Sequence, residues 1–318
     1  MERKVLLETQ DLRKTFEIRG RGTLTAVGGV NLKLHAGETL GLVGESGCGK
    51  TTLGRTLVKL YRPDSGRILF EGKDIWTQNR KENLHYHKDV QMIYQDPYAS
   101  LDPLSVVSTS IGEGLDIHGL YRGRERRERI LELLQMVGLN REHANRFPHE
   151  FSGGQRQRIG IARALAVEPR VLVCDEPISA LDVSIQAQII NLLMRLQQET
   201  GMAYLFITHD LSMVKAISDR IAVMYLGSIV EMAGAETLYK RHCHPYTEAL
   251  LSAIPIPDPE VEAKRKRILL RGDIPSPVNL GKGCPFAGRC PRADAKCHDS
   301  CPELREVEKG HFAACHRV

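Results

Sequence analysis

Short apolar runs alternate with helix-like segments from the start of the chain to about residue 253. Residues 39–43, 171–174 and 203–208 have the length and the apolar character of buried strands. Alternation of such strands with helices is typical of an α/β layer fold. The sequence therefore predicts an α/β domain over residues 1–253.

One stretch of this domain is poor in strand-like runs. Between Pro97 and Phe151 the apolar residues recur at helical spacing, and Gly138 follows as a helix stop. The spaced residues are Ile130, Leu133, Leu134 and Val137. This pattern predicts a helical subdomain, over about residues 97–158, inserted into the α/β core.

The amino-acid composition of the chain changes after residue 253. Prolines at positions 255, 257 and 259 deny both helix and central-strand pairing, which predicts a linker over residues 254–280. Residues 281–318 then hold five of the eight cysteines in a polar segment that is too small to form its own core. We expect this segment to be a Cys-rich appendix.

Composition narrows the class of protein only a little. The chain has 318 residues, 42% hydrophobic content and a formal net charge of +5. No stripe of Lys and Arg dominates, so we expect no nucleic-acid partner. No run of 18 apolar residues occurs, so we expect no membrane span. Unpaired cysteines at positions 48 and 174, inside the predicted domain, indicate a reducing compartment.

The first candidate functional motif is a glycine-rich loop between a predicted strand and a predicted helix. Residues 44–51 read GESGCGKT, which fits the phosphate-binding P-loop pattern. Its glycines let backbone N–H groups point at phosphate, and the start of the helix favours negative charge. Lys50 would neutralise phosphate charge, and the Thr51 hydroxyl is placed to bind Mg²⁺. The predicted nucleotide-binding residues here are Gly44, Glu45, Ser46, Gly47, Cys48, Gly49, Lys50, Thr51 and Thr52.

A second motif supplies carboxylates. The apolar strand 171–174 ends in Asp175 and Glu176. A buried strand would deliver Asp175 to the mouth of the sheet beside the P-loop, where it can hold Mg²⁺, while Glu176 can act as the general base toward water. A P-loop alone does not choose among kinases, GTPases, helicases and transport ATPases; the motifs that follow do.

Residues 151–155, FSGGQ, precede a predicted helix, and here the chain resembles the ATP-binding cassette (ABC) family. Two glycines before a helix N-terminus make a second anion site, with a hydroxyl from Ser152. The family usually has Leu where Phe151 stands. The resemblance implies that Ser152, Gly153, Gly154 and Gln155 cap the γ-phosphate held by a partner cassette. One cassette per chain therefore implies a dimer.

The resemblance extends to the remaining family motifs. It implies that Gln95 senses Mg²⁺ and the attacking water, and that His209 contacts the γ-phosphate and orients Glu176. It also implies that residues 179–182, SALD, form the loop that crosses to the partner, with Asp182 near the nucleotide. Phe16 is the expected aromatic that stacks on adenine, where the family more often has Tyr. The predicted catalytic set is thus Glu176, His209 and Gln95.

Three longer segments resemble one subfamily more closely. Residues 95–103, 175–186 and 244–251 are similar to the F-type ATPase subunit of bacterial oligopeptide/dipeptide importers. That resemblance implies ATP hydrolysis coupled to peptide transport, at the cytoplasmic face of the inner membrane. It also implies two permease subunits, a second ATPase (a sister or a copy) and an extracytoplasmic peptide-binding protein. Nickel chelates and glutathione are carried by relatives and stay open as cargo.

The cysteines of the appendix allow several chemistries. Four thiolates can ligate a [4Fe–4S] cluster or a structural zinc ion, and the residues alone also leave disulfides or free thiols open. The spacing lacks the tight pairs that are usual for zinc ribbons. The subfamily resemblance implies a [4Fe–4S] cluster on Cys284, Cys290, Cys297 and Cys315. Cys301 has no counterpart in that pattern, although it could replace Cys297.

Two other classes of protein remain as alternatives. A soluble, non-transport ABC ATPase usually carries two cassettes or a long coiled coil, and this sequence shows neither. A catalytically dead regulatory cassette is opposed by the intact Lys50, Glu176 and His209.

Overall fold

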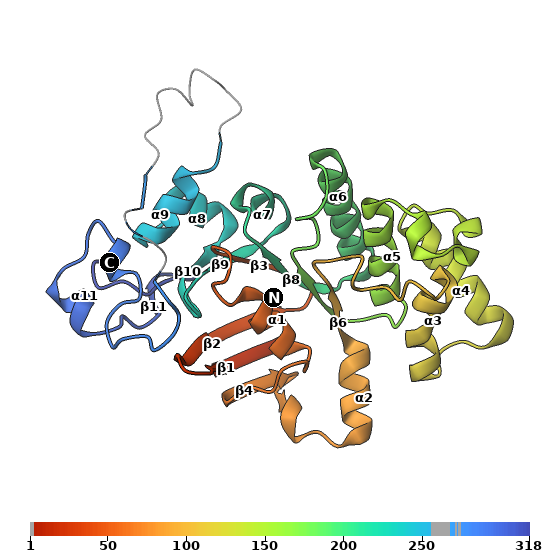
Figure 1. The fold of residues 1–318 in the computed structure, drawn as a ribbon, viewed down its shortest axis with the longest axis horizontal. Coiled ribbons are helices and arrows are strands. Elements are labelled where there is room, and N and C mark those ends of the chain that lie inside the picture. The colour runs from red at the N-terminus through yellow and green to blue at the C-terminus, as the bar shows by residue number, and fades with distance from the viewer. Residues whose placement is uncertain (1–2, 256–267, 271, 273–274) are drawn as a thin grey trace. The chain divides into compact units, whose positions relative to one another are not determined.

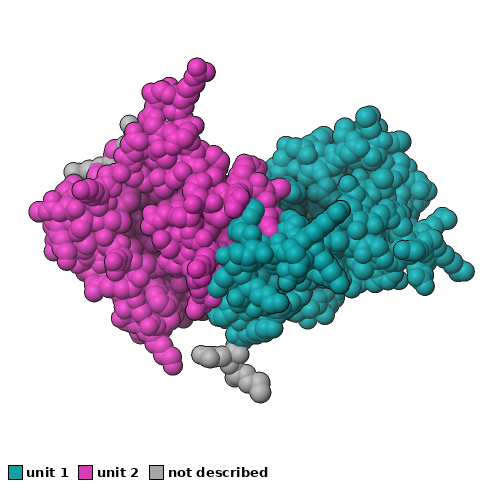
Figure 2. Space-filling model, turned by 90° about the horizontal axis from the view of Figure 1, so that it is seen from below, with its two compact units in different colours: residues 1–7, 34–38, 69–207 teal, residues 8–33, 39–68, 208–318 magenta. Residues whose placement is uncertain are grey.

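The computed structural model describes residues 3–255, 268–270, 272 and 275–318 (Figure 1). The chain forms two compact units, which Figure 2 shows in separate colours. Unit 1 comprises residues 1–7, 34–38 and 69–207, and unit 2 comprises residues 8–33, 39–68 and 208–318. The predicted linker over residues 254–280 lies largely outside the described residues, so that boundary stays a prediction.

The sheet of unit 1 is parallel. Its strands are β6 (Val90–Ile93), β7 (Val171–Asp175) and β8 (Ala203–Thr208), in the order β8-β7-β6. The side chains of β7 and β8 are buried, as expected for strands covered on both faces. Because parallel strands end at the same edge, the residues that follow β6 and β7 meet there.

Helices fill the rest of unit 1. No strand occurs between β6 and β7, a stretch that the structure describes in full. The predicted helix is α4 (Gly123–Met136), whose buried face includes Ile130, Leu133 and Leu134, and Gly138 follows it with φ 76°. The strand-poor segment is therefore helical, as predicted. The other elements of the unit are β5 (Lys73–Asp74), η1 (Ile75–Thr77), α2 (Arg80–Asp89), α3 (Val107–His118), η2 (Arg141–Asn145), η3 (Pro148–Glu150), α5 (Gly153–Leu165) and α6 (Val183–Thr200).

Unit 2 carries the P-loop strand. The strand β3 (Thr39–Val43) is parallel to β9 (Arg220–Tyr225), and β9 is antiparallel to β10 (Ser228–Gly234). Most of β1 (Val5–Ile18), β2 (Gly22–His35) and β4 (Ser65–Phe70) also belongs to this unit. Its helices in the first 255 residues are α1 (Lys50–Leu57), α7 (Leu211–Ile217), α8 (Ala235–Arg241) and α9 (Pro245–Ser252).

The Cys-rich appendix extends the sheet of unit 2. Its strand β12 (His311–Ala313) pairs antiparallel with β10, and β11 (Arg305–Glu308) pairs with β12. Two short helical turns, η4 (Ala287–Arg289) and α11 (Ala295–Asp299), come before these strands. Phe286 is only 1% exposed, and its ring contacts those of Tyr225 and Tyr246 at centroid distances of 5.3 and 5.4 Å. The appendix thus packs on the unit that holds the P-loop.

Candidate nucleotide-binding and catalytic site

The P-loop has the predicted strand–loop–helix form. It connects β3 to α1, which begins at Lys50. The Lys50 side chain is buried, and its Nζ donates to the carbonyl oxygens of Gly44 at 2.8 Å and Glu45 at 3.0 Å. These two hydrogen bonds hold the Lys50 ammonium group inside the P-loop, where it can neutralise the charge of a bound phosphate.

Two glycines explain why the loop can receive phosphate. Gly49 has φ 107°, and a Cβ there would lie 1.9 Å from the carbonyl oxygen of Ala26. Gly47 has φ 78° and no atom within 4 Å of the place for a Cβ, so the loop surface at this position is open. The first N–H groups of α1 have no acceptor within the helix, which suits an anion. The residues present fit a nucleotide phosphate.

Phe16 presents a half-buried ring in the same unit. It forms a T-shaped pair with the Tyr61 ring at a centroid distance of 5.6 Å, and the Lys14 ammonium lies 5.2 Å from its centroid. An aromatic ring of this kind can stack on a base. Its role toward adenine stays a prediction.

At the carboxyl edge of the unit 1 sheet, two predicted residues meet. The Gln95 Nε2 donates to the Glu176 Oε2 at 3.0 Å. Glu176 has φ 44°, a left-handed conformation that costs a non-glycine residue about 1–3 kcal/mol. Its N–H donates to the Ile207 carbonyl oxygen at 3.0 Å, which anchors this conformation. Asp175, one residue earlier, is buried at 1% exposure. Glu176 thus holds a strained conformation directly after the buried strand β7.

The SGGQ motif forms the start of α5. The Gln155 N–H donates to the Ser152 Oγ at 3.3 Å, and the Ser152 N–H donates to the Gln155 Oε1 at 3.0 Å, which is a reciprocal capping box. A Cβ on Gly154 would lie 2.6 Å from the Ile185 side chain of α6, so this glycine lets the two helices approach. Asp182 is the N-cap residue of α6.

His209 and the P-loop belong to unit 2, whereas Gln95, Ser152, Asp175, Glu176 and Asp182 belong to unit 1. His209 is exposed and follows β8 directly. The next residue, Asp210, caps α7 by accepting from the Ser212 N–H at 2.7 Å. This cap fixes where the chain turns after His209, and the predicted contact of His209 with Glu176 stays a prediction.

The structure adds a contact to the P-loop that the sequence did not predict. The Arg289 guanidinium binds both oxygens of the Glu45 carboxylate, at 2.8 and 3.0 Å. The Glu45 N–H donates to the Tyr246 hydroxyl at 3.0 Å. The hydrogen bonds to Glu45 raise the pKa of Arg289. No motif marks Arg289; its only sequence signal is its place before Cys290.

The eight cysteines are free thiols, so the disulfide alternative is absent from this structure. Backbone N–H groups two residues on donate to the sulfurs of Cys290 and Cys315, both at 3.4 Å. Cys297 is buried, and Cys301 is exposed. Burial, and then the neighbouring Cys301, Cys297 and Cys290, raise the pKa of Cys284 to about 11.

The spacing of these sulfurs bears on which metal fits. Tetrahedral zinc with Zn–S bonds of about 2.3 Å would hold its sulfur ligands about 3.8 Å apart. Among the described residues, no three cysteine sulfurs lie within 4.8 Å of one another. A cubane cluster, in which each iron binds one thiolate, needs a wider spacing, and N–H donors to sulfur are a feature of such sites.

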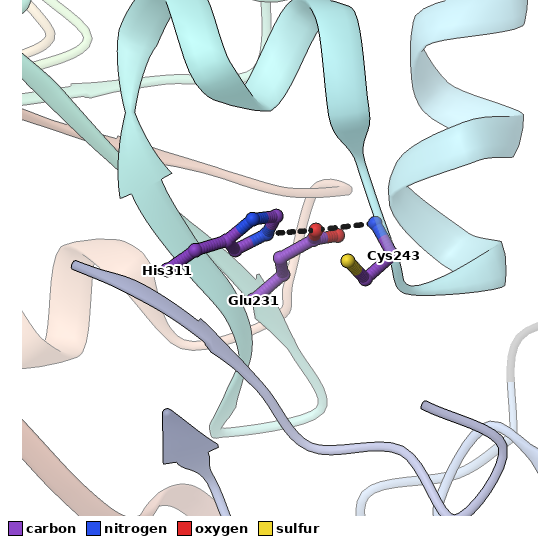
Figure 3. Close-up of side chains that lie close together, drawn as sticks. All are labelled: Glu231, Cys243 and His311. Carbon is purple, nitrogen blue, oxygen red and sulfur yellow. Dashed lines mark hydrogen bonds and ion pairs between the residues drawn. The ribbon is translucent and has the colours of Figure 1, made fainter. Parts of the chain in front are cut away.

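A separate group gathers on β10, β12 and the segment after α8: Glu231, Cys243 and His311 (Figure 3). Their potential ligand atoms lie within 4.8 Å of one another. However, the buried Glu231 carboxylate already accepts from the His311 Nε2 at 2.7 Å and from the N–H groups of Cys243 and His244 at 2.6 and 3.0 Å. The His311 Nδ1 is buried and has no hydrogen-bond partner among the described residues. The hydrogen bonds to Glu231 tie β12 to β10.

Comparison with known proteins agrees with this geometry. Residues 27–179 match the family model "ABC transporter", and residues 230–297 match "Oligopeptide/dipeptide transporter, C-terminal region". The putative oligopeptide transport ATP-binding protein YkfD of Bacillus subtilis is 55% identical, over 99% of this chain and 96% of its own length. The oligopeptide transport ATP-binding protein OppF of the same organism is 54% identical, over 98% and 96%.

Solved structures show the same fold. The dimeric post-hydrolysis state of the ATP-binding cassette MJ0796, bound to ADP and Pi, is 30% identical with a TM-score of 0.66, over 72% of this chain and 98% of that one. CbiO1 from Clostridium perfringens is 28% identical with the same TM-score, over 75% and 92%.

The fold and the P-loop define an ATPase of the P-loop class, with the α/β core and helical insertion of an ABC cassette. Within that class, the chain belongs to the family of oligopeptide transport ATP-binding proteins of ABC transporters. Among the described residues, none of the helices has the length and apolar character to cross a membrane.

Proposed function

We propose that this chain hydrolyses ATP to drive the import of di- and oligopeptides across the cytoplasmic membrane. The observation that carries the proposal is the similarity, over nearly the whole chain, to oligopeptide transport ATP-binding proteins. It includes the C-terminal region as well as the cassette. A soluble, non-transport ABC ATPase is the alternative.

Each residue of the candidate site has its own role in the proposed hydrolysis of ATP. Lys50 balances the charge of the β- and γ-phosphates, and Thr51 and Asp175 would hold Mg²⁺, which supplies further charge neutralisation. Glu176 takes the proton from water as it attacks the γ-phosphorus, and the bond to the leaving ADP oxygen breaks. Gln95, which donates to Glu176, holds that carboxylate in place.

Each site needs a second cassette. The start of α5 is open at Ser152, which is exposed, and the amides of Gly153 and Gly154 have no acceptor within the helix. These groups can bind the γ-phosphate of a partner, which is a second copy or a sister ATPase. The exposed loop at Ser179 and Ala180 suits a crossing to that partner.

A membrane partner would dock on unit 1. Tyr98 and Leu104 lie shortly after Gln95 and are 64% and 85% exposed. Exposed apolar side chains that follow, within nine residues, a residue that touches Glu176 suit a permease contact that reports on the nucleotide. Two permease subunits would hold the chain at the cytoplasmic face of the membrane, and an extracytoplasmic binding protein would supply the peptide.

The appendix would hold a [4Fe–4S] cluster on Cys284, Cys290, Cys297 and Cys315. The subfamily resemblance of this segment supports this choice, and the N–H groups that donate to the sulfurs of Cys290 and Cys315 are compatible with it. Protein purified without oxygen should be brown and carry about four irons per chain. Cys301→Ser should keep the iron, whereas Cys290→Ser should lose it. Colourless protein with one zinc would refute the cluster.

The transport proposal is tested by reconstitution. The chain would be co-expressed with two candidate permease subunits, and uptake of a labelled dipeptide and a labelled pentapeptide would be measured in proteoliposomes with a candidate binding protein. ATP-dependent uptake that disappears with Glu176→Gln supports the proposal. Uptake of a nickel chelate or glutathione instead of peptide would refute the cargo. Failure to co-purify with any permease would favour the soluble alternative.

A further inference from the structure

The contact between the appendix and the P-loop is specific. The Arg289 guanidinium and the Glu45 carboxylate form two parallel hydrogen bonds, at 2.8 and 3.0 Å, across 244 residues of sequence. Their side chains are 9% and 23% exposed. A bidentate pair with this much burial is stronger and more selective in geometry than a surface ion pair.

Arg289 itself is held by packing and by a turn. Its N–H donates to the Phe286 carbonyl oxygen at 3.0 Å, and Phe286 is buried against Tyr225 and Tyr246. Its guanidinium lies 5.9 Å from the centroid of the Tyr225 ring. The turn starts at Cys284, whose N–H donates to the Cys297 carbonyl oxygen at 2.7 Å. The cysteine turn thus sets the position of the guanidinium.

The negative charge of Glu45 is unfavourable in a loop that binds phosphate. A carboxylate in the loop that receives the negative phosphates of ATP opposes their binding, because like charges repel most strongly where water is partly excluded. Arg289 cancels this charge. Tyr246 restrains the same residue through its backbone, because the Glu45 N–H donates to the buried Tyr246 hydroxyl.

We propose that Arg289 is a positioning residue for ATP binding: it neutralises Glu45 and fixes the first turn of the P-loop from the Cys-rich appendix. The inference rests on the proposed role of the P-loop and goes beyond it, because it makes the appendix part of the nucleotide site. ATP affinity then depends on whether the cysteine turn is folded.

The test measures the Kd of the full chain for a fluorescent ATP analogue with Mg²⁺. Arg289→Ala leaves Glu45 uncompensated and should raise the Kd about tenfold. Glu45→Gln removes the repulsion but keeps the positive charge, so it should lower the Kd about threefold. The double variant should fall between the two. This sign pattern separates charge compensation from a purely structural role, which would weaken binding in all three.

Two variants serve as controls. Arg292→Ala removes a nearby surface arginine, 53% exposed and paired with Glu248, and should bind ATP like the wild type. Arg289→Lys keeps the positive charge but loses the two parallel hydrogen bonds of the guanidinium. Its Kd should stay within about threefold of wild type, and this variant keeps the test valid even if Arg289→Ala does not fold. In the assembled ATPase, Arg289→Ala should raise KM for ATP and leave kcat within about twofold.

The outcomes separate this inference from the role of the P-loop. If Lys50→Ala abolishes ATP binding while Arg289→Ala binds like wild type, the inference is wrong and the P-loop assignment stands. If Lys50→Ala binds ATP normally, the P-loop assignment itself fails. A double variant no better than Arg289→Ala would also overturn the charge argument.

Discussion

Replacing Glu176 with Gln tests the centre of the proposed mechanism. Glutamine has the shape of glutamate, and its amide oxygen can still accept the hydrogen bond that the Gln95 Nε2 donates at 3.0 Å. The left-handed φ of 44° at this position is no harder for Gln than for Glu. The substitution therefore removes little except the ability to accept a proton.

The size of the effect follows from that single loss. A positioned general base contributes about 10²- to 10⁴-fold, which is about 2.7–5.4 kcal/mol of activation free energy. ATP hydrolysis should fall by this factor in the assembled transporter. Binding of ATP should persist, because Lys50 and the loop amides are unchanged, and an ATP-bound pair of cassettes should accumulate.

The assay is phosphate release by the reconstituted complex, alongside ATP binding and the state of association by size-exclusion chromatography. Glu199→Gln is the matched control: Glu199 lies in unit 1 with a 55% exposed side chain and makes a long ion pair, 3.9 Å, to Arg195. It should hydrolyse ATP like the wild type. Hydrolysis by Glu176→Gln within threefold of wild type would refute the base assignment, and loss of ATP binding would show a structural role instead.

Three further outcomes follow from the structure. Ser152→Ala should impair hydrolysis by the assembled pair and leave ATP binding by the monomer intact; a monomer that hydrolyses ATP at the full rate would contradict the shared site. Phe286→Ala, at a ring 1% exposed, should lower the free energy of unfolding by about 3–5 kcal/mol in urea, and a change below 1 kcal/mol would show that the appendix does not share the core of unit 2. Burial lowers the pKa of His244 to about 4, so the unfolded chain binds the extra proton between pH 6.5 and 4, and stability should fall as the pH falls through this window. In the wild type the Tyr246 N–H donates to the His244 Nδ1, and the side-chain oxygen of Asn can replace this acceptor in His244→Asn. The variant should therefore show a weaker pH dependence of the urea midpoint. An unchanged dependence would assign the effect to another titrating group.

Much of the local structure around the candidate site could be predicted from sequence because its determinants are local. The start of α1 at Lys50 depends on glycines that accept unusual backbone angles, and the start of α5 depends on a Ser and a Gln three residues apart. The buried strands β3, β7 and β8 follow from short apolar runs. The helix α4 follows from spacing that repeats every three or four residues.

Local patterns did not predict the contacts between distant segments. Family resemblance, and not periodicity, placed Gln95 near the water that Glu176 would activate, and their hydrogen bond spans 81 residues. The predictions treated the appendix as separate from the P-loop, since a proline-rich segment divides them in sequence. Apolar pattern indicated a segment too small for its own core, but it did not indicate which surface would supply the missing contacts.

The sequence by itself determined the class of fold, the phosphate loop and the carboxylate at the end of its strand, because each depends on neighbours a few residues away. Only the tertiary structure decided that β12 adds to β10, that Phe286 enters the aromatic cluster, and that Arg289 reaches Glu45. The physical reason is that strand pairing and charge pairing between remote segments depend on the packing of whole elements. No local pattern of apolar and polar residues encodes that packing.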